Sequence, residues 1–160
     1  MDLILWRHAY ARRLPEWPIP ALEEDLAREL TPKGHVQAKV AAKWLRQRLS
    51  ASTRVLCSPA VRCQETVRYL EMDYRICEGI DPQAEAQALL EAAKWPVSKQ
   101  PVLLVGHQPA LGQVLSKLLG IHGEAVPFRK AGIWWLRHRV RDGVEQTTVH
   151  AVVCPESLHG

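Results

Sequence analysis

The sequence of 160 residues lacks several features that mark common classes of protein. No apolar run approaches the roughly 18 residues that cross a bilayer, so the sequence predicts no membrane-spanning helix and no membrane partner. Internal repeats, low-complexity tracts and Gly/Ser-rich linkers are also missing, which favours one domain over residues 1–160. The start of the chain has no basic and apolar pattern of a secretory signal, so we expect a cytoplasmic protein.

Cysteine is scarce, and its spacing is not of a metal-binding or redox type. The four cysteines are Cys57, Cys63, Cys77 and Cys154, and they form no Cys-x-x-Cys pair. The sequence also has no His-Glu-x-x-His segment, no cluster of aspartates and no Gly-x-x-x-x-Gly-Lys phosphate loop. We therefore expect reduced thiols, no metal and no cofactor, so that any chemistry would depend on side chains alone.

An excess of charge of one sign is likewise small. Lys and Arg number 21 and Asp and Glu 17, which gives a net charge of +4 with neutral histidines. The densest basic run, Arg137-His-Arg-Val-Arg141, has no nucleic-acid recognition motif or interleaved aromatic residues. We interpret it as a solvated strand whose positive side chains discourage edge pairing, rather than as a nucleic-acid patch.

The sequence does contain a regular alternation of apolar runs and amphipathic segments. The expected strands span residues 2–6, 54–57, 74–77, 102–106, 132–138 and 146–153. The expected helices span residues 32–49, 60–70, 83–94 and 110–119. This alternation predicts a single-domain, three-layer α/β/α fold with a mainly parallel sheet. The dipeptide Asp142-Gly143 predicts a hairpin between the last two strands, and hence an antiparallel edge strand.

Four helix starts are expected where a polar residue precedes a proline. They are Thr31-Pro32, Ser58-Pro59, Asp81-Pro82 and Gln108-Pro109. Three of them follow expected strands, and ligands of open α/β sheets bind at the carboxyl ends of strands. Helix N-termini at that edge would offer free N–H groups to an anion.

Two regions receive no role from the sequence. The segment 9–31 is a long, proline-containing connection, and a loop of this length is either functional or plain surface. The pair Trp134-Trp135 should give one buried and one half-exposed residue of a strand. An exposed tryptophan there could contact a partner.

Side chains that can carry positive charge follow three of the expected strands. Arg7 and His8 end the first, Ser58 and Arg62 follow the second, and His107 ends the fourth. If these strands are parallel neighbours, the two histidines and two arginines converge on one anion site. A neutral imidazole at His8 can attack phosphorus. Nearby arginines would lower its pKa and clamp phosphoryl oxygens.

A leaving group that needs a proton requires an acid near the same site. Glu78, which follows the third expected strand, and Asp81, at the next helix start, are the candidates. For Asp81 we favour a helix-capping role. For Glu78 a proton donor and an exposed loop residue are equally open.

Four segments resemble, in order, the motifs of the histidine phosphatase superfamily, the phosphoglycerate-mutase-like group. They are Leu5-Trp-Arg7-His8-Ala9, Leu30-Thr-Pro-Lys-Gly34-His-Val-Gln37-Ala, Ser58-Pro-Ala-Val-Arg62-Cys-Gln-Glu-Thr66 and Val105-Gly-His107-Gln-Pro. Two positions depart from the superfamily pattern, because Ala9 stands in place of glycine and Gln64 falls one place early. The shortness of the chain and the lead-in Asp25-x-x-Arg28-x-Leu30 are similar to the small phosphohistidine phosphatases, the SixA-like branch, although Glu29 stands where proline is usual.

The resemblance implies a role for each matching residue. His8 would be the phosphorylated nucleophile, and Arg7, Arg62 and His107 would form the phosphate pocket. Ser58 would contact the substrate with them. Glu78 is the weakest transfer, since the loop around it matches no firm pattern.

The resemblance also implies an activity. We expect a metal-independent phosphatase that acts on a phosphohistidine-containing protein, such as a phosphotransfer domain of a signalling relay. Among phosphatase substrates, a phosphohistidine depends least on a general acid, because its P–N bond is labile. The alternatives are a phosphatase of small monoesters, such as sugar or nucleotide phosphates, and a non-catalytic phosphate-binding adaptor. The sequence sets neither the physiological partner nor the oligomeric state.

Overall fold

The apolar run at the start of the chain forms strand β1 (Asp2–Arg7), which lies inside the sheet. Its side chains alternate between the two faces, as the period of a strand requires. Ile4 and Trp6 belong to one buried cluster, and Leu3 and Leu5 belong to another. All four are fully buried, as expected of a strand covered on both faces. These coordinates come from a computed structural model that describes residues 1–158.

The sheet has six strands in the order β3-β2-β4-β1-β5-β6. Besides β1 they are β2 (Arg54–Cys57), β3 (Arg75–Ile76), β4 (Val102–Gly106), β5 (Ile133–Arg141) and β6 (Val144–Val153). The neighbours among β1 to β4 are parallel, whereas β5 is antiparallel to β1 and β6 to β5. The predicted fold class is therefore confirmed.

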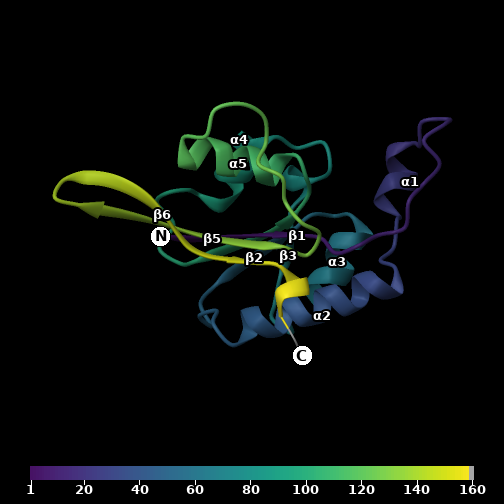
Figure 1. Ribbon diagram of the computed structural model, residues 1–160, viewed down its shortest axis with the longest axis horizontal. Coiled ribbons are helices and arrows are strands. Elements are labelled where there is room, and N and C mark those ends of the chain that lie inside the picture. Colours follow the sequence, from purple (N-terminus) through teal and green to yellow (C-terminus); the bar gives the residue numbers. More distant parts are fainter. Residues whose placement is uncertain (159–160) are drawn as a thin grey trace.

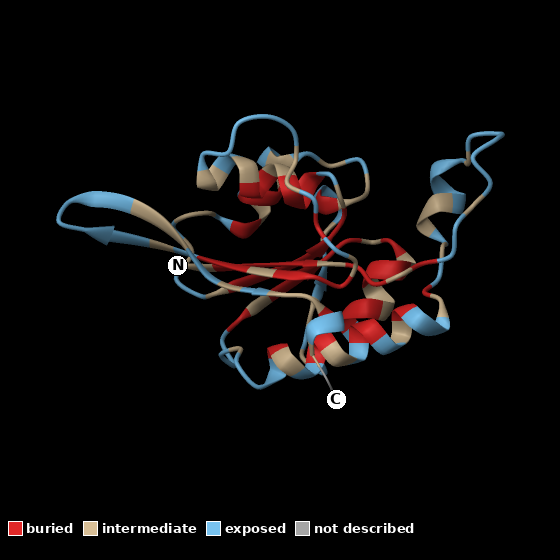
Figure 2. Ribbon diagram, viewed as in Figure 1, coloured by how far each residue is buried: buried red, intermediate tan, exposed pale blue. Residues whose placement is uncertain are grey.

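Helices cover both faces of the sheet (Figure 1). The helices are α1 (Leu22–Leu26), α2 (Pro32–Arg46), α3 (Val61–Arg68), α4 (Ala86–Ala93) and α5 (Ala110–Leu119), with short 3-10 turns η1 (Glu78–Ile80) and η2 (Pro155–Ser157). The buried faces of α2 and α3 pack with Ile4 and Trp6, and those of α4 and α5 pack with Leu3 and Leu5. Buried residues concentrate in the central strands and the helix faces turned toward them (Figure 2). No helix of the described residues has the length and apolarity needed to span a membrane.

The strand and hairpin predictions agree well with the structure, with one exception. Strands 54–57 and 102–106 and helix 110–119 have the predicted bounds, whereas the third strand shrinks from 74–77 to Arg75–Ile76. The hairpin between β5 and β6 turns at Asp142 and Gly143, with φ of 51° and 76°. Positive φ at both residues suits the tight turn that the Asp-Gly pair predicted.

Only one of the four predicted helix starts is confirmed. The Thr31 hydroxyl accepts a hydrogen bond from the Gly34 N–H at 3.1 Å, and Pro32 is the first residue of α2. The prediction for Asp81 is wrong, because α4 begins only at Ala86. The Asp81 carboxylate instead accepts from the Gln83 N–H at 3.0 Å and closes a local turn.

The other two helices begin one or two residues after the proline rather than at it. Helix α3 begins at Val61 with Ala60 at its cap, and the Ser58 hydroxyl accepts from the Ala60 N–H while it also contacts His107. Helix α5 begins at Ala110 with Pro109 at its cap. Gln108 still caps that helix from further away, since its Oε1 accepts from the Gly112 N–H at 2.8 Å.

The segment 9–31 is a tied loop rather than a free connection. Ala11 and Leu30 form an isolated antiparallel bridge, and the Arg12 N–H donates to the Glu29 carbonyl at 2.8 Å. Between these ties the segment forms α1 and projects from the body of the molecule (Figure 1). A five-residue helix is too short to be recognised by periodicity, which is why the sequence did not predict it.

The tryptophan pair behaves as predicted. Trp135 is 6% exposed and packs edge-to-face against Trp44, with ring centroids 6.2 Å apart. Trp134 is half-buried on the opposite face, near Phe128. Neither side chain is left as an exposed contact surface.

Candidate active site

His8 follows β1 and is held in a defined orientation. Its backbone N–H donates to the Gly106 carbonyl of the neighbouring strand β4 at 3.1 Å. Its ring Nδ1 lies 2.7 Å from the Ala9 carbonyl oxygen. Because a carbonyl only accepts, Nδ1 carries the proton, and the lone pair is left on Nε2.

The surroundings keep this imidazole neutral. The side chain is 7% exposed. Burial, followed by repulsion from His107, lowers the pKa of His8 well below its ordinary value, and Arg62 and Arg7 lower it further. The bond to Ala9 offsets only part of this effect. His8 therefore presents an unprotonated nitrogen at neutral pH, the form that acts as a nucleophile.

His107 lies next to His8 because β4 is the parallel neighbour of β1. The two ring centroids are 5.4 Å apart. The His107 Nε2 is 2.7 Å from the Ser58 hydroxyl, and its Nδ1 is 3.3 Å from Nη2 of Arg62. A guanidinium only donates, so Nδ1 accepts and Nε2–H donates to Ser58. Burial, reinforced by Arg62, lowers the pKa of His107 to about 3.

Arg62 reaches this pair from the first turn of α3. It is 4% exposed, and its charge is met by Asp25 of α1. Its Nη1 donates to the Asp25 carbonyl at 2.7 Å, and its Nη2 donates to the Asp25 carboxylate at 3.1 Å. The projecting loop thus has a defined contact with the cluster.

Asp25 is the residue that sequence reasoning missed as a member of the site. Its other carboxylate oxygen accepts from Nη1 of Arg28 at 3.1 Å. Burial raises the pKa of Asp25, but the charges and hydrogen bonds of Arg62 and Arg28 outweigh it and lower the pKa overall. The signal for this contact was the lead-in Asp25-x-x-Arg28-x-Leu30, although nothing in the residues themselves indicated which arginine Asp25 would meet.

Two guanidinium groups in the cluster keep unused donors. The Nε atoms of Arg7 and Arg62 are buried and have no hydrogen-bond partner within residues 1–158. Arg7 donates through Nη1 to the Phe128 carbonyl. Burial, then repulsion from Arg62, lowers the pKa of Arg7. Arg62 is buried and Arg7 is half-buried, and cations that repel each other while retaining free N–H groups are suited to bind a tetrahedral oxyanion.

Ser58 and Cys63 surround the far side of the His107 ring. Ser58 is fully buried, and its hydroxyl accepts from the Ala60 N–H as well as meeting His107. The Cys63 sulfur lies 3.5 Å from the His107 Nε2, and burial raises the pKa of this thiol to about 12. Ser58 therefore contacts His107 and can position that ring, while its contact with substrate stays a prediction.

The two acid candidates make no hydrogen bond to this cluster in the part of the chain that the structure describes. Glu78 is exposed in η1. Asp81 closes its own turn, as described above. Within the same residues no group of three or more His, Cys, Asp or Glu side chains could hold a metal ion.

The remaining motif residues hold the chain that follows His8. The Ala9 N–H donates to the Thr66 hydroxyl at 3.0 Å, and the Tyr10 N–H donates to Gln37 Oε1 at 3.1 Å. Only glycine fits at position 34, because a Cβ there would collide with the Tyr10 carbonyl oxygen. These contacts join residues of the second and third motif segments to the chain that follows Arg7-His8.

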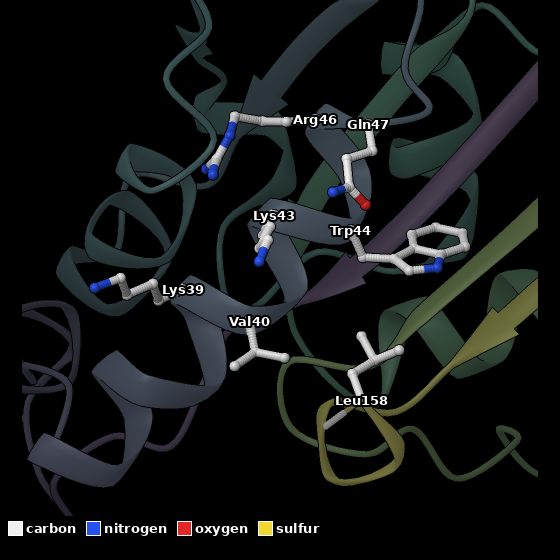
Figure 3. A pocket seen from close by; sticks show the side chains of 7 residues that line it. All are labelled: Lys39, Val40, Lys43, Trp44, Arg46, Gln47 and Leu158. Atoms are coloured by element: carbon white, nitrogen blue, oxygen red, sulfur yellow. The ribbon is translucent and has the colours of Figure 1, made fainter. Parts of the chain in front are cut away.

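A separate hollow of about 420 Å³ lies between the outer side of α2 and the end of the described chain (Figure 3). Its lining contains none of the cluster residues and consists of Lys39, Val40, Lys43, Trp44, Arg46, Gln47 and Leu158. The buried His8–Arg62–His107 cluster, rather than this hollow, is the candidate active site.

Comparison with known proteins agrees with this geometry. The family model of the histidine phosphatase superfamily (branch 1) matches residues 3–82. The chain is 34% identical over 136 residues to the phosphohistidine phosphatase SixA homolog of Haemophilus influenzae, covering 75% of this chain and 78% of that relative.

Two solved structures share the fold over nearly the full length. The putative phosphohistidine phosphatase SixA from Agrobacterium tumefaciens superposes with a TM-score of 0.75 at 22% identity, covering 96% of this chain and 97% of that one. Phosphoserine phosphatase from Entamoeba histolytica superposes with a TM-score of 0.67 at 17% identity, covering 99% of both chains. With the family model, the 34% identical relative and the four motifs in agreement, the chain belongs to the histidine phosphatase superfamily.

Proposed function

We propose that this protein is a phosphatase that transfers a phosphoryl group to His8 and then to water, and that its substrate is a phosphohistidine on a protein partner. One observation carries the proposal. His8 is buried and neutral with its Nε2 lone pair free, beside two arginines whose Nε donors are unused. The whole chain would act as one histidine-phosphatase-like domain.

The first step forms a covalent intermediate. The Nε2 lone pair of His8 attacks phosphorus, and the bond from phosphorus to the leaving nitrogen or oxygen breaks. The leaving group departs with that electron pair and takes a proton from solvent. Arg62 and Arg7 hold the non-bridging oxygens, and such electrostatic stabilisation is commonly the largest catalytic contribution.

The second step releases phosphate. Water attacks phosphorus, the bond to Nε2 breaks, and its electron pair returns to His8. The proton of the attacking water leaves to solvent. His107 and Arg62 stay beside the phosphoryl group in both steps, because Ser58 and Asp25 fix their positions.

The protonation state of the nearby carboxylate supports this substrate class. Asp25 has a lowered pKa and is bonded to two arginines, so it is a poor proton donor. A phosphohistidine has a labile P–N bond, and its imidazole can be protonated by solvent. The relative from Haemophilus influenzae, named as a phosphohistidine phosphatase homolog, also supports this class.

A substrate panel tests the proposal. A histidine-containing phosphotransfer domain, phosphorylated chemically with phosphoramidate, is compared with p-nitrophenyl phosphate, phosphoserine and glucose 6-phosphate. We expect kcat/KM to be at least about 10²-fold higher for the phosphohistidine protein, a difference of roughly 2.7 kcal/mol in the barrier. His8→Ala should abolish turnover of all of them.

Other results would support one of the alternatives. A higher kcat/KM for a monoester would identify a small-ester phosphatase. Binding of inorganic phosphate without turnover of any substrate would identify a phosphate-binding adaptor.

A further inference from the structure

The site is surrounded by more positive charge than one phosphoryl group requires. Four further cations lie outside the catalytic cluster, and we call them the cationic rim: Arg13, Arg28, Lys33 and Lys130. Two of them lie near the aromatic ring of Tyr10, which is two residues beyond His8. The Lys130 Nζ lies 3.7 Å from the centroid of that ring, and the Lys33 Nζ lies 5.3 Å away.

The other two members are continuous with the catalytic arginine. Arg28 shares the carboxylate of Asp25 with Arg62. Arg13 and Arg28 line one hollow of about 330 Å³ together with Asp25, and Glu16 is the other acidic residue of that lining. Arg28 and Arg13 therefore connect the Arg62–Asp25 pair to a hollow at the surface.

The members of the cationic rim also repel one another. Burial lowers the pKa of Lys130, and repulsion from Arg7, Arg13, Arg28 and Lys33 lowers it further. Like charges gathered in this way are destabilising unless an anionic partner meets them. Acidic side chains of the same segment are partly engaged elsewhere, since the Glu24 carboxylate accepts from the Ala21 N–H at the start of α1.

An exposed apolar tip lies in the same segment as Arg13. Trp17 and Ile19 are 81% and 78% exposed. Three prolines, Pro15, Pro18 and Pro20, restrict the backbone around them. The tip projects beside α1 and is exposed along its length (Figure 2). A small phosphate ester has no apolar surface to cover this tip, whereas a protein has.

We propose that the cationic rim and the tip at Trp17 and Ile19 form a docking surface for a protein that carries acidic residues around its phosphohistidine. This inference rests on the proposed function and names the chemistry of its partner. Acidic side chains of the partner would meet Arg13, Lys33 and Lys130, and an apolar side chain would cover Trp17. The phosphohistidine between them would then enter toward His8.

Two fluorescein-labelled peptides test the docking surface, one with Asp and Glu around a central histidine and one with Ser and Gly there. Each is used unphosphorylated for binding by anisotropy and phosphorylated with phosphoramidate for turnover. The double variant Arg13→Gln/Lys33→Gln should lower kcat/KM for the acidic phosphopeptide and its binding by about tenfold or more. Turnover of the Ser/Gly phosphopeptide and of p-nitrophenyl phosphate should stay within about twofold. Trp17→Ala should weaken the binding of the acidic peptide by several-fold.

Salt and a matched variant provide the controls. The advantage of the acidic peptide should shrink as ionic strength rises, because exposed charges are screened. Lys39→Gln/Lys43→Gln also removes two positive charges, but from the separate hollow of Figure 3, and it should change neither binding nor turnover.

The possible failures are distinguishable. Equal turnover of both phosphopeptides, unaffected by the rim variant, would overturn the docking surface and leave the proposed function intact. Rim-dependent binding of the acidic peptide without turnover of any phosphopeptide would support docking and overturn the proposed function. If the rim variant weakens turnover of fructose 1,6-bisphosphate as much as the acidic peptide and Trp17→Ala affects neither, the rim is a small-anion subsite and the docking proposal is wrong.

Discussion

Arginine and histidine occur together in two regions of this molecule, and the two regions treat them in opposite ways. At the carboxyl ends of the parallel strands, the buried His8, Arg62 and His107 gather with the half-buried Arg7. In the antiparallel hairpin of β5 and β6, the arginines of the run that begins at Arg137 are exposed, whereas His138 between them is half-buried. The residue types are the same, so composition does not distinguish the regions.

The difference lies in burial and neutralisation. Arg137 is paired with both carboxylate oxygens of Asp2, at 2.7 and 3.0 Å, and the hydrogen bond to Asp2 raises its pKa. Arg139 donates to Gln146. Burial instead lowers the pKa of Arg7, and a donor of that group is left unused. A buried cation without a full set of partners indicates a missing anion, whereas an exposed and paired cation indicates a solvated surface.

The largest effect should separate these two regions directly. Arg62→Ala removes a buried donor at the phosphoryl site, so turnover should fall by about 10²–10³-fold. Arg139→Ala removes an exposed arginine of the hairpin and should leave turnover within about twofold. Steady-state kinetics with the phosphohistidine protein measure both. Equal losses in the two variants would show that burial does not mark the functional arginine.

Acid should destabilise the protein through its buried histidines. The pKa of His8 and of His107 is lowered in the folded state, the latter to about 3, so the unfolded chain binds protons that the folded chain does not. Stability is therefore complete above the ordinary histidine pKa of about 6.5 and falls as the pH drops below it. Each histidine should lower the free energy of unfolding by about 1.4 kcal/mol between pH 7.5 and pH 5.5.

Urea unfolding at the two pH values measures this loss. His107→Gln should remove about half of the contribution of the two histidines. An unchanged pH dependence in His107→Gln would contradict the buried, neutral state of that ring.

A smaller effect is expected where one cluster residue positions another. Ser58→Ala removes the partner of the His107 Nε2 and should lower kcat by about tenfold, the effect of one buried hydrogen bond of roughly 1.4 kcal/mol. KM should change little, because the hydroxyl contacts His107. A large rise in KM with unchanged kcat would return Ser58 to the substrate-contacting role expected from the sequence.

The smallest effect is expected in the hairpin. Arg137→Ala breaks the pair with Asp2, but the arginine is 44% exposed, so solvent screens the interaction. The free energy of unfolding should fall by less than about 1 kcal/mol, and turnover should not change. A loss of several kcal/mol would mean that this pair is as important to the fold as a buried one.

The sequence predicted the features that follow from local periodicity. The continuous apolar run Leu3-Ile-Leu-Trp6 indicated a buried strand, and Asp142-Gly143 indicated the hairpin. The proximity of His8 and His107 followed from one further rule, that carboxyl ends of parallel strands meet at one edge of a sheet.

What the sequence could not predict depends on the path of a loop or on competition between hydrogen bonds. Asp25 reaches Arg62 only because the ties at Ala11 and Leu30 fold the segment back over the site. Ser58 was expected to open a helix and contact substrate, yet its hydroxyl is turned toward His107. These contacts join residues far apart in the chain, so no local pattern records them.

The identity of the residue that carries phosphorus during turnover is the most direct test. The enzyme is mixed with ³²P-labelled phosphohistidine protein, quenched in base within the first turnovers, digested and analysed by mass spectrometry. The label should be stable in base, labile in acid and located on His8, and His8→Ala should show none. Label on another residue, or full turnover by His8→Ala, would contradict the central role of that imidazole.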